Sequence, residues 1–329
     1  MGCGLVNNDS VQTGGLPDEG GGRPHEAGGT DKPILEMVGI TKRFPGILAL
    51  DSVDFRLLHG EVHAIVGENG AGKSTLIKIL AGAHQKDSGV IYLEGRPVNI
   101  SSPADAARLG ISVIHQEFTL IPAMTVAENI LLSDLPLRRA GVLDKRAMVA
   151  RAAEVLDNLG VDIPPSATVR SLRVAEQQIV EIAKALSRKA RIIVMDEPTA
   201  ALSEMEVARL FSVIRSMVEQ GVSVIYISHK LDEVFEIANT ITVLRDGRKV
   251  LTTSASLTTK EQVVHEMVGR DIGNMFPKQH VPRGDVVLEV KDIRLSGGHS
   301  PISFNVRAGE IVGIVGLMGA GQIRLARAL

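Results

Sequence analysis

The sequence predicts an α/β fold built around a mainly parallel β-sheet, because strand-like and helix-like patterns alternate along the chain. Short, continuously apolar runs are typical of strands that are buried on both faces of a parallel sheet. The chain contains three of them: Val62–Val66, Ile192–Met195 and Val222–Ile227. Segments with helical periodicity lie between these runs, at Ser74–Leu80, Gln177–Leu186 and Glu204–Met217.

Composition and charge narrow the class of protein further. The 329 residues are enough for about two domains, and the hydrophobic fraction of 44% supplies a sizeable core. A net charge of −2 and an aromatic content of 3% without Trp argue against a nucleic-acid binder. The single cysteine, Cys3, excludes a disulfide framework, and no apolar stretch approaches the roughly 18 residues that would span a bilayer. We therefore expect a soluble intracellular protein with no nucleic-acid partner.

The patterns predict a tail, followed by a first domain with a helical insertion. Residues 1–32 are rich in Gly, Asp, Asn and Pro, and we expect this tail to be disordered because it can bury little apolar surface. Residues 33–270 carry the alternating strand and helix patterns. Between about 122 and 190 the chain is rich in Ala and Leu without a strand pattern, which indicates a helical subdomain inserted into the sheet domain.

A repeat predicts the start of a second domain of the same type. The segment Gly60–Gly72 matches Gly309–Gly321 at an offset of 249 residues. We assign residues 271–284 to a linker and residues 285–329 to an N-terminal fragment of this second domain. About 45 residues cannot form an independent α/β domain, so we expect the second domain to be truncated.

A complete phosphate-loop motif, G-x-x-x-x-G-K-[ST], lies between the first predicted strand and its helix. Its glycines let backbone N–H groups curl around phosphates, and the N-terminus of the following helix favours negative charge. Lys73 is expected to reach the β- and γ-phosphates of a nucleotide, and the Ser74 hydroxyl is expected to ligate Mg²⁺. The candidate nucleotide-binding residues of the loop are Gly67, Glu68, Asn69, Gly70, Ala71, Gly72, Lys73, Ser74 and Thr75.

Two adjacent carboxylates, Asp196 and Glu197, follow the apolar run at Ile192–Met195. Acidic pairs at the end of a buried strand are costly unless a cation balances them. We expect Asp196 to belong to the Mg²⁺ shell and Glu197 to orient or deprotonate an attacking water molecule. The sequence therefore predicts phosphoryl transfer to water.

Together with three further residues, these motifs resemble those of the ATP-binding cassette (ABC) ATPases over residues 34–329. The resemblance implies a P-loop NTPase fold with an antiparallel β subdomain, and it implies ATP and Mg²⁺. Gln116, in VIHQEFTLIP, matches the family's Q-loop, which contacts Mg²⁺ and the attacking water. His229, in ISHKLDEVFEIA, matches the switch histidine at the γ-phosphate, and residues 199–203 match the D-loop. Phe44 matches the aromatic residue that stacks on adenine.

Other stretches resemble, more narrowly, the tandem ATP-binding subunits of bacterial monosaccharide importers of the ribose, xylose or galactose type. They are Thr41–Gly46, Glu181–Leu186, Ile227–Leu231 and Met267–Arg270, together with a second phosphate loop that lacks its lysine. This resemblance implies an ATPase that is a peripheral subunit at the cytoplasmic face of a bacterial membrane and powers sugar import. The implied partners are integral membrane permease subunits, a second ABC domain and, indirectly, an extracytoplasmic sugar-binding protein.

The sequence departs from the family pattern at two places. Arg173 stands where the family's signature motif has a serine, and Ala175 stands where it usually has a glycine. In the second copy of the phosphate loop, Gln322 replaces the lysine, and Ile323 and Arg324 replace the Ser/Thr pair. Because ABC domains pair head to tail, the resemblance implies that both departures fall in one composite ATP site. We expect this site to be slow or silent; the alternative is that Arg173 reaches a phosphate as an arginine finger would.

Two alternative functions stay open on the sequence alone. A soluble tandem ABC protein that acts on ribosomes would carry a long, basic, helical linker, whereas residues 269–285 are short and mixed in character. A non-catalytic remnant is the second alternative, because truncation of the second domain would remove half of the working site.

Overall fold

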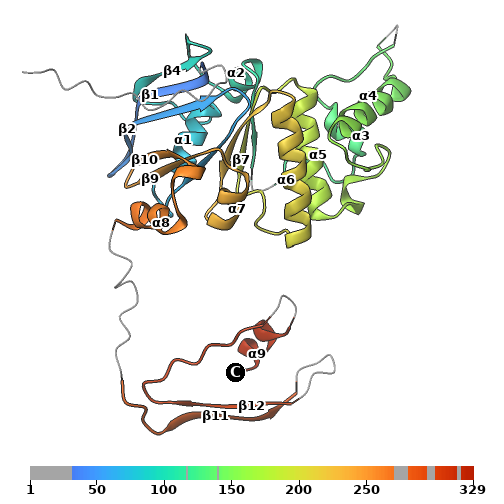
Figure 1. Ribbon diagram of the computed structural model, residues 1–329. Helices are drawn as coiled ribbons and strands as arrows, with labels where there is room; N and C mark the ends of the chain where they lie inside the picture. Colours follow the sequence, from blue (N-terminus) through green and yellow to red (C-terminus); the bar gives the residue numbers. More distant parts are fainter. Residues whose placement is uncertain (1–31, 116–117, 139–140, 270–280, 295–300, 317–319) are drawn as a thin grey trace, which may run out of the picture. The chain divides into compact units, whose positions relative to one another are not determined.

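The computed structural model describes residues 32–115, 118–138, 141–269, 281–294, 301–316 and 320–329 (Figure 1). The chain divides into two compact units, the first ending at Gly269 and the second comprising Arg270–Leu329. The tail expected at residues 1–32 lies outside the described residues except for Lys32, and so does the expected linker up to residue 280.

Strands and helices alternate through most of the first unit. Its strands are β1 (Pro33–Phe44), β2 (Ile47–Leu58), β3 (Val62–Val66), β4 (Ser88–Leu93), β5 (Arg96–Val98), β6 (Ile111–Ile114), β7 (Ile192–Asp196), β8 (Ser223–Ile227), β9 (Thr240–Arg245) and β10 (Arg248–Ser254). Its helices are α1 (Lys73–Leu80), α2 (Pro103–Arg108), α3 (Val126–Ile130), α4 (Lys145–Asn158), α5 (Val174–Ser187), α6 (Glu204–Glu219), α7 (Leu231–Ile237) and α8 (Lys260–Val268), with 3-10 turns η1 (Val169–Ser171) and η2 (Ala255–Leu257).

The central sheet of this unit is mainly parallel, as the sequence predicts. Its strand order is β10-β9-β3-β8-β7-β6, and every neighbouring pair except β9–β10 is parallel. A second sheet, in the order β2-β1-β4-β5, is antiparallel throughout. The predicted α/β fold, with an antiparallel β portion beside the parallel sheet, is therefore confirmed.

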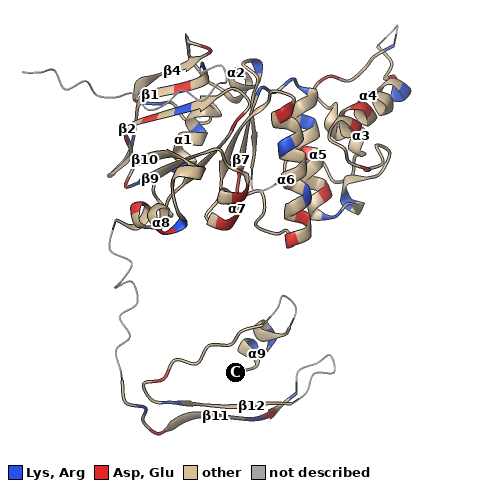
Figure 2. Cartoon of the chain, in the orientation of Figure 1, with Lys and Arg blue, Asp and Glu red and all other residues tan. Residues whose placement is uncertain are grey.

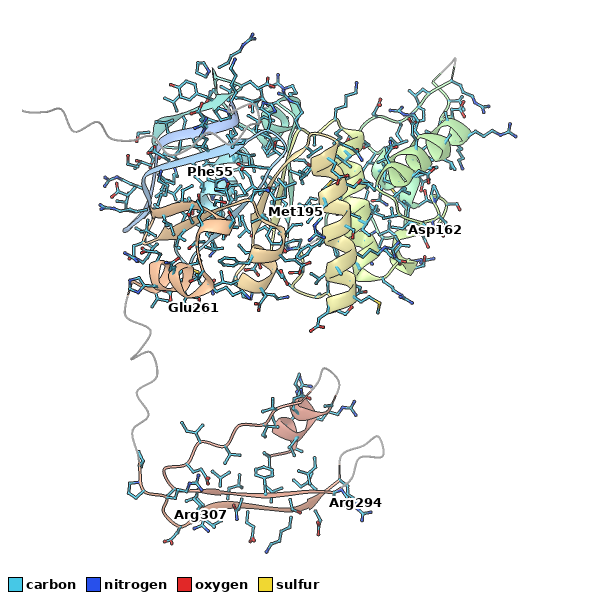
Figure 3. All side chains as sticks on the ribbon, in the orientation of Figure 1. Phe55, Asp162, Met195, Glu261, Arg294 and Arg307 are labelled. Carbon is cyan, nitrogen blue, oxygen red and sulfur yellow. The ribbon has the colours of Figure 1, made fainter. Side chains whose placement is uncertain are left out.

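The central strands are buried on both faces, which explains why their sequences are continuously apolar. Along β3, Val62, Ala64 and Val66 belong to one core cluster, whereas Ile65 belongs to another, because successive side chains of a strand point to opposite faces. The first cluster contains residues of α5 and α6, and the second contains residues of α1 and of the antiparallel sheet. Met195 and Phe55, labelled in Figure 3, belong to the first and second cluster, respectively.

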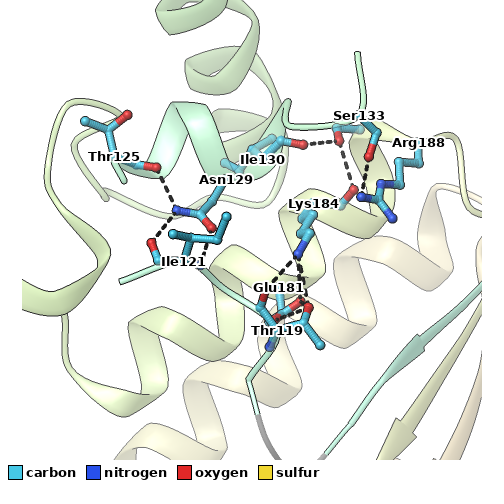
Figure 4. Close-up of polar contacts among 10 residues, drawn as sticks. Thr119, Ile121, Thr125, Asn129, Ile130, Ser133, Glu181, Lys184 and Arg188 are labelled. Carbon is cyan, nitrogen blue, oxygen red and sulfur yellow. Dashed lines mark hydrogen bonds and ion pairs between the residues drawn. The ribbon is translucent and has the colours of Figure 1, made fainter. Parts of the chain in front are cut away.

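The chain between β6 and β7 is helical, with α3, α4, η1 and α5, and its described residues form only isolated β-bridges. A buried polar cluster ties the start of this segment to α5 (Figure 4). Glu181 accepts hydrogen bonds from the backbone N–H of Thr119 at 2.6 Å and from its hydroxyl at 2.9 Å. The ammonium of Lys184 donates to the same hydroxyl at 3.0 Å, and Asn129 donates to the carbonyl of Ile121 at 3.1 Å. These contacts fix the path of the chain between the sheet and the helices.

The observed helices extend the predicted ones by one to a few residues, for local reasons. The helix predicted from Gln177 begins at Val174, where the Glu176 carboxylate accepts a hydrogen bond from the N–H of Arg173 at 2.8 Å. Helix α6 begins at the predicted residue, with Ser203 and Glu206 forming a capping box. Such caps satisfy N–H groups that the first helical turn leaves without a partner.

The exposed faces of the helices carry charges of both signs. Acidic and basic side chains follow one another along α6, from Glu204 to Glu219, while the strands of the central sheet hold few charges (Figure 2). Among the described residues, the helices are too short or too polar to cross a lipid bilayer.

The second unit contains an antiparallel hairpin and a short helix. The hairpin pairs β11 (Val286–Ile293) with β12 (Ile302–Arg307), and the helix is α9 (Gln322–Ala328). Residues 311–315, which correspond to β3 in the repeat, form no strand, and Ile311 and Val315 are almost fully exposed at 98% and 95%.

Candidate active site

Two adjoining cavities of about 520 Å³ and 740 Å³ lie at the carboxyl ends of β3 and β7. In open α/β sheets this edge is where ligands bind. The residues that line both cavities are Asn69, Ser74, Asp196 and Glu197. The predicted residues Gly70, Gly72, Lys73 and Thr75 line the first cavity, and Gly67, Glu68 and His229 line the second. The structure thus brings two sequence motifs and the histidine to one cleft.

The loop between β3 and α1 needs glycine at two positions. A Cβ atom on Gly67 would lie 2.3 Å from the carbonyl oxygen of Leu244 in β9, and one on Gly72 would lie 2.8 Å from the carbonyl oxygen of Ala49. Gly72 also has a φ of +103° as the residue that caps α1, a conformation that glycine adopts readily. The loop is therefore wedged between neighbouring backbone segments, and the N-terminus of α1 opens into the cavity.

Lys73 is buried and turned back onto the loop that carries it. Its Nζ donates hydrogen bonds to the carbonyl oxygens of Gly67 at 2.7 Å and Glu68 at 3.0 Å. Burial lowers the pKa of Lys73, while the nearby Glu197 and Asp196 carboxylates act in the opposite direction. A cation that is desolvated and held only by neutral carbonyls is well prepared to pair with an anion.

Asp196 and Glu197 form an acidic pair at the carboxyl end of β7, within reach of the charge of Lys73. Asp196 is the last residue of β7, and burial and the charge of Glu197 raise its pKa. Glu197 has a φ of +49°, a left-handed conformation that costs about 1–3 kcal/mol for a residue other than glycine. Its N–H donates to the carbonyl of Ile227 at the end of β8, at 2.9 Å, so the strained residue is fixed at the sheet edge.

His229 lies within hydrogen-bonding distance of Glu197. Its Nδ1 is 3.0 Å from Oε1 of Glu197, and the direction of this hydrogen bond depends on the tautomer of the ring. The imidazole is mostly exposed, so it can also face a ligand in the second cavity. Glu197 therefore lies between the phosphate loop and the histidine.

The donor set at the cleft fits a hard divalent cation. The hydroxyl of Ser74 and the carboxylate of Asp196 are oxygen ligands of the kind that Mg²⁺ prefers. Burial and, after it, the charge of Glu197 raise the pKa of Asp196, and a bound cation would act against both. Within the described ranges, the protein provides no cluster of three or more His, Cys, Asp or Glu side chains for a metal ion.

Three predicted site residues, Gln116, Ala71 and Phe44, are not among the described residues that line the two cavities. Gln116 lies outside the described residues. Ala71 is buried within the loop and does not line either cavity. Phe44 is not among the residues that line either cavity, and its ring packs edge-on against His84 with centroids 5.4 Å apart, while Lys42 Nζ lies 5.5 Å from its centroid. Its predicted role in adenine stacking stays a prediction.

Some of the residues that line the cavities were not assigned to the site from the sequence. They are Ile47, Leu48, Ala49, Asp246, Gly247 and Met267. The Asp-Gly dipeptide at 246–247 is a hairpin signal and does connect β9 to β10. Nothing in the local sequence indicates that Gly247 also donates its N–H to the carbonyl of Ala71 in the loop, at 3.2 Å. Such contacts between residues far apart in sequence require the fold.

Comparisons with known proteins agree with this geometry. Residues 50–200 match the family model described as ABC transporter. The chain is 56% identical, over 91% of its length, to ribose import ATP-binding protein RbsA 1 of Rubrobacter xylanophilus, and 49% identical, over 90%, to a putative ribose/galactose/methyl galactoside import ATP-binding protein of Burkholderia lata. It spans only 59% and 56% of the length of these two relatives.

Solved structures of cassettes share the fold. A nucleotide-free ATP-binding cassette from an ABC transporter is 25% identical, with a TM-score of 0.61 over 73% of this chain and 96% of the cassette. An ATP-binding cassette in its ADP conformation is 26% identical, with a TM-score of 0.63 over 74% of this chain and 98% of the cassette. Both alignments include nearly the whole of the solved cassette.

Proposed function

Because the first unit of this chain belongs to the ABC transporter family of ATP-binding cassettes, we propose that the chain is an ATP-hydrolysing subunit of a monosaccharide importer. One observation carries the hydrolytic part of the proposal. Lys73, Asp196, Glu197 and His229 line adjoining cavities at one edge of the sheet. The names of the relatives, which refer to ribose and galactose import, support the transport part.

The phosphate loop is the proposed binding site for the nucleotide. Its backbone N–H groups and the N-terminus of α1 offer donors and a partial positive charge to the phosphates. The ammonium of Lys73, now bonded to two loop carbonyls, would exchange these neutral partners for the β- and γ-phosphate oxygens. That exchange is favourable because a cation in a partly desolvated site is attracted more strongly to anionic oxygens than to neutral carbonyls.

Ser74 and Asp196 are the proposed ligands of Mg²⁺, and Gln116 is a third ligand predicted from the sequence alone. A bound Mg²⁺ supplies neutralisation of the charge on the phosphate oxygens. Asp196 would then stay ionised, because the cation offsets the repulsion that Glu197 exerts on it.

Glu197 is the proposed general base. Its carboxylate would accept a proton from water as the water oxygen bonds to the γ-phosphorus and the bond from that phosphorus to the bridging oxygen of ADP breaks. His229, through its contact with Oε1 of Glu197, would hold the base in place and face the γ-phosphate. The donors are fixed before the reaction, which is the usual source of electrostatic catalysis.

The importer role implies a set of partners. Integral membrane permease subunits would bind this chain at the cytoplasmic face of the bacterial membrane, where the chain is peripheral. A second ABC domain would complete the ATP sites, and an extracytoplasmic sugar-binding protein would act indirectly through the permease. The names of the relatives support these proposals at the level of sugar import, without naming the sugar for this chain.

The substitution Glu197→Gln tests the proposed hydrolysis. It preserves size and hydrogen bonding but removes the base, so Mg·ATP should bind with its affinity unchanged while phosphate release slows by at least about 100-fold. Calorimetric titration and steady-state phosphate release measure the two quantities. Glu219→Gln, an exposed carboxamide substitution at the end of α6, is the control and should change neither. Unchanged turnover in Glu197→Gln would assign the base to another residue.

A further inference from the structure

A buried carboxylate, Glu233, joins the turn after Glu197 to the turn around His229. Glu233 lies in the first turn of α7 and is 8% exposed. Its Oε2 accepts a hydrogen bond from the hydroxyl of Thr199 at 2.6 Å, and Thr199 follows the acidic pair by two residues. The same oxygen accepts a hydrogen bond from the hydroxyl of Ser228 at 3.3 Å, immediately before His229.

Lys230 closes the network from the other side of His229. Its Nζ lies 3.0 Å from Oε1 of Glu233 and donates to the carbonyl oxygen of Thr199 at 3.2 Å. Its N–H donates to the hydroxyl of Ser228 at 3.0 Å. Both neighbours of His229 in the chain are therefore attached to Glu233, and one of them also contacts the turn that follows Glu197.

The environment of Glu233 suits a carboxylate that orients other groups. The phenol of Tyr226 donates to Oε2 at 2.9 Å, and burial and the charge of Glu233 raise the pKa of Tyr226, so the phenol stays a neutral donor. A buried carboxylate is stable only when such donors compensate it. Four side chains contribute here: Thr199 comes from the turn after Glu197, Ser228 and Lys230 come from the turn around His229, and Tyr226 comes from β8.

The strained backbone at Glu197 needs such support. A residue other than glycine keeps a left-handed conformation only where its surroundings fix it. The Glu197 N–H is held by Ile227, and the segment that follows is held by the pairing of Thr199 with Glu233. Removal of this pairing would free one side of the strained turn.

We propose that Glu233 is a positioning residue, which sets the distance between Glu197 and His229 by tying the Thr199 turn to the Ser228–Lys230 turn. This inference rests on the proposed function, because the positioned pair is the proposed catalytic pair. A misplacement of about 1 Å at a reacting group can slow a reaction by about 100-fold. The network therefore controls turnover and leaves nucleotide affinity, which depends on the phosphate loop, unchanged.

The test compares Glu233→Gln with Glu61→Gln in the full chain. Glu61 is a matched control, since it is 7% exposed and accepts hydrogen bonds from the Leu58 N–H and the Thr240 hydroxyl at the opposite end of β3. We expect Glu233→Gln to lower phosphate release by about tenfold or more, with the Kd for Mg·ATP within about twofold of the parent. It should also shift the ¹⁵N signals of the His229 imidazole. Glu61→Gln should lower the Tm alone.

A second pair of variants keeps the test decisive if Glu233→Gln does not fold. Thr199→Val removes the hydroxyl donor and should lower turnover like Glu233→Gln, whereas Thr199→Ser keeps the hydroxyl and should retain it. Turnover and His229 signals at parent values in Glu233→Gln or Thr199→Val would overturn the proposal. If the parent chain binds Mg·ATP but releases no phosphate, the proposed hydrolysis by this chain alone fails, and the His229 signals still decide whether Glu233 positions the histidine.

Discussion

The two copies of the phosphate-loop segment share their local geometry. In the first copy, Leu58 donates its N–H to the Glu61 carboxylate at 2.7 Å, and in the second, Arg307 donates to Glu310 at 3.1 Å. The glycines that precede α1 and α9 have φ values of 103° and 96°. Lys73 donates to the Gly67 carbonyl at 2.7 Å, and Gln322 donates to the corresponding Gly316 carbonyl at 2.8 Å.

The copies differ in what surrounds them. All residues of β3 are buried between β8 and β9, whereas Ile311 and Ile314 of the second copy are exposed by 98% and 45%. No strand pairs with residues 311–316 in the described part of the second unit. The repeated sequence therefore reproduces the described contacts on either side of the loop, whereas in the first copy distant strands bury the segment and bring carboxylates to it.

The largest expected effect concerns burial. Ile65 is fully buried in β3, so Ile65→Ala should lower the free energy of unfolding by about 2–5 kcal/mol. Ile314 is its counterpart in the repeat and is 45% exposed, so Ile314→Ala should change that free energy by at most about 0.5 kcal/mol. Urea unfolding followed by circular dichroism measures both. Equal losses would mean that the second copy is packed as tightly as the first.

The next effect concerns charge at the loop. Lys73→Ala removes a charge-assisted contact to phosphate that is worth about 1.5–3 kcal/mol, so the Kd for Mg·ATP should rise by about 10- to 150-fold. Gln322→Ala is the matched variant in the second copy and should leave the Kd within about twofold of the parent. Calorimetric titration of both variants measures the difference. A weaker Kd in Gln322→Ala would show that the second loop contributes to binding.

A smaller effect concerns the acidic pair Asp196 and Glu197, which lines the cavity of the first loop. The described residues 320–329 of the second copy contain no Asp or Glu. The pKa of Asp196 is raised by burial and by Glu197, so its ionisation destabilises the folded chain. Below pH 3.8, the ordinary value, the carboxyl is protonated in both states and the cost vanishes. Asp196→Asn should therefore raise the Tm of the nucleotide-free chain at pH 7, and this gain should shrink to nothing as the pH falls below 3.8.

Saturating Mg·ATP supplies the control for this prediction. Asp196→Asn removes a proposed cation ligand, so the variant should gain less stability from Mg·ATP than the parent does. If the Tm difference between parent and variant changed neither with pH nor with Mg·ATP, the electrostatic account of this site would be wrong.

The parts of the fold that are encoded locally could be predicted from the sequence. The apolar runs gave the central strands β3, β7 and β8 to within one residue, because burial on both faces excludes polar residues. Helix α5 was predicted three residues too short at its start, because its first turn depends on the carboxylate of Glu176 rather than on apolar periodicity. Periodicity reports the buried face of a helix and carries little information about its ends.

The motif residues of the site could be predicted from the sequence, whereas the other residues that line its cavities could not. Lys73, Asp196, Glu197 and His229 converge on one cleft as their motifs imply. Ile47 and Asp246 line it through contacts between residues about 200 positions apart, for which a single sequence carries no signal. Glu233 likewise looks like an ordinary surface residue of a helix until its partners are known.

The smallest effect is expected for the substitution that restores the missing lysine of the second copy, Gln322→Lys. Gln322 already makes the contact that Lys73 makes, and that contact is exposed, so Gln322→Lys should change the free energy of unfolding by at most about 0.5 kcal/mol. If a phosphate loop alone sufficed for affinity, this substitution would create a second nucleotide site.

The difference between the two copies predicts that Gln322→Lys creates no second nucleotide site. The first loop lines one cavity together with Asp196 and Glu197, which β7 brings to it from more than 100 residues away, and the described part of the second unit contains no adjacent pair of acidic residues. Without them, a lysine at position 322 can attract phosphate but cannot organise a cation beside it. Calorimetric titration of Gln322→Lys should therefore give the parent stoichiometry of one Mg·ATP per chain, with the Kd within about twofold. A stoichiometry of two would mean that the loop carries affinity by itself, and burial would no longer explain the difference between the two copies.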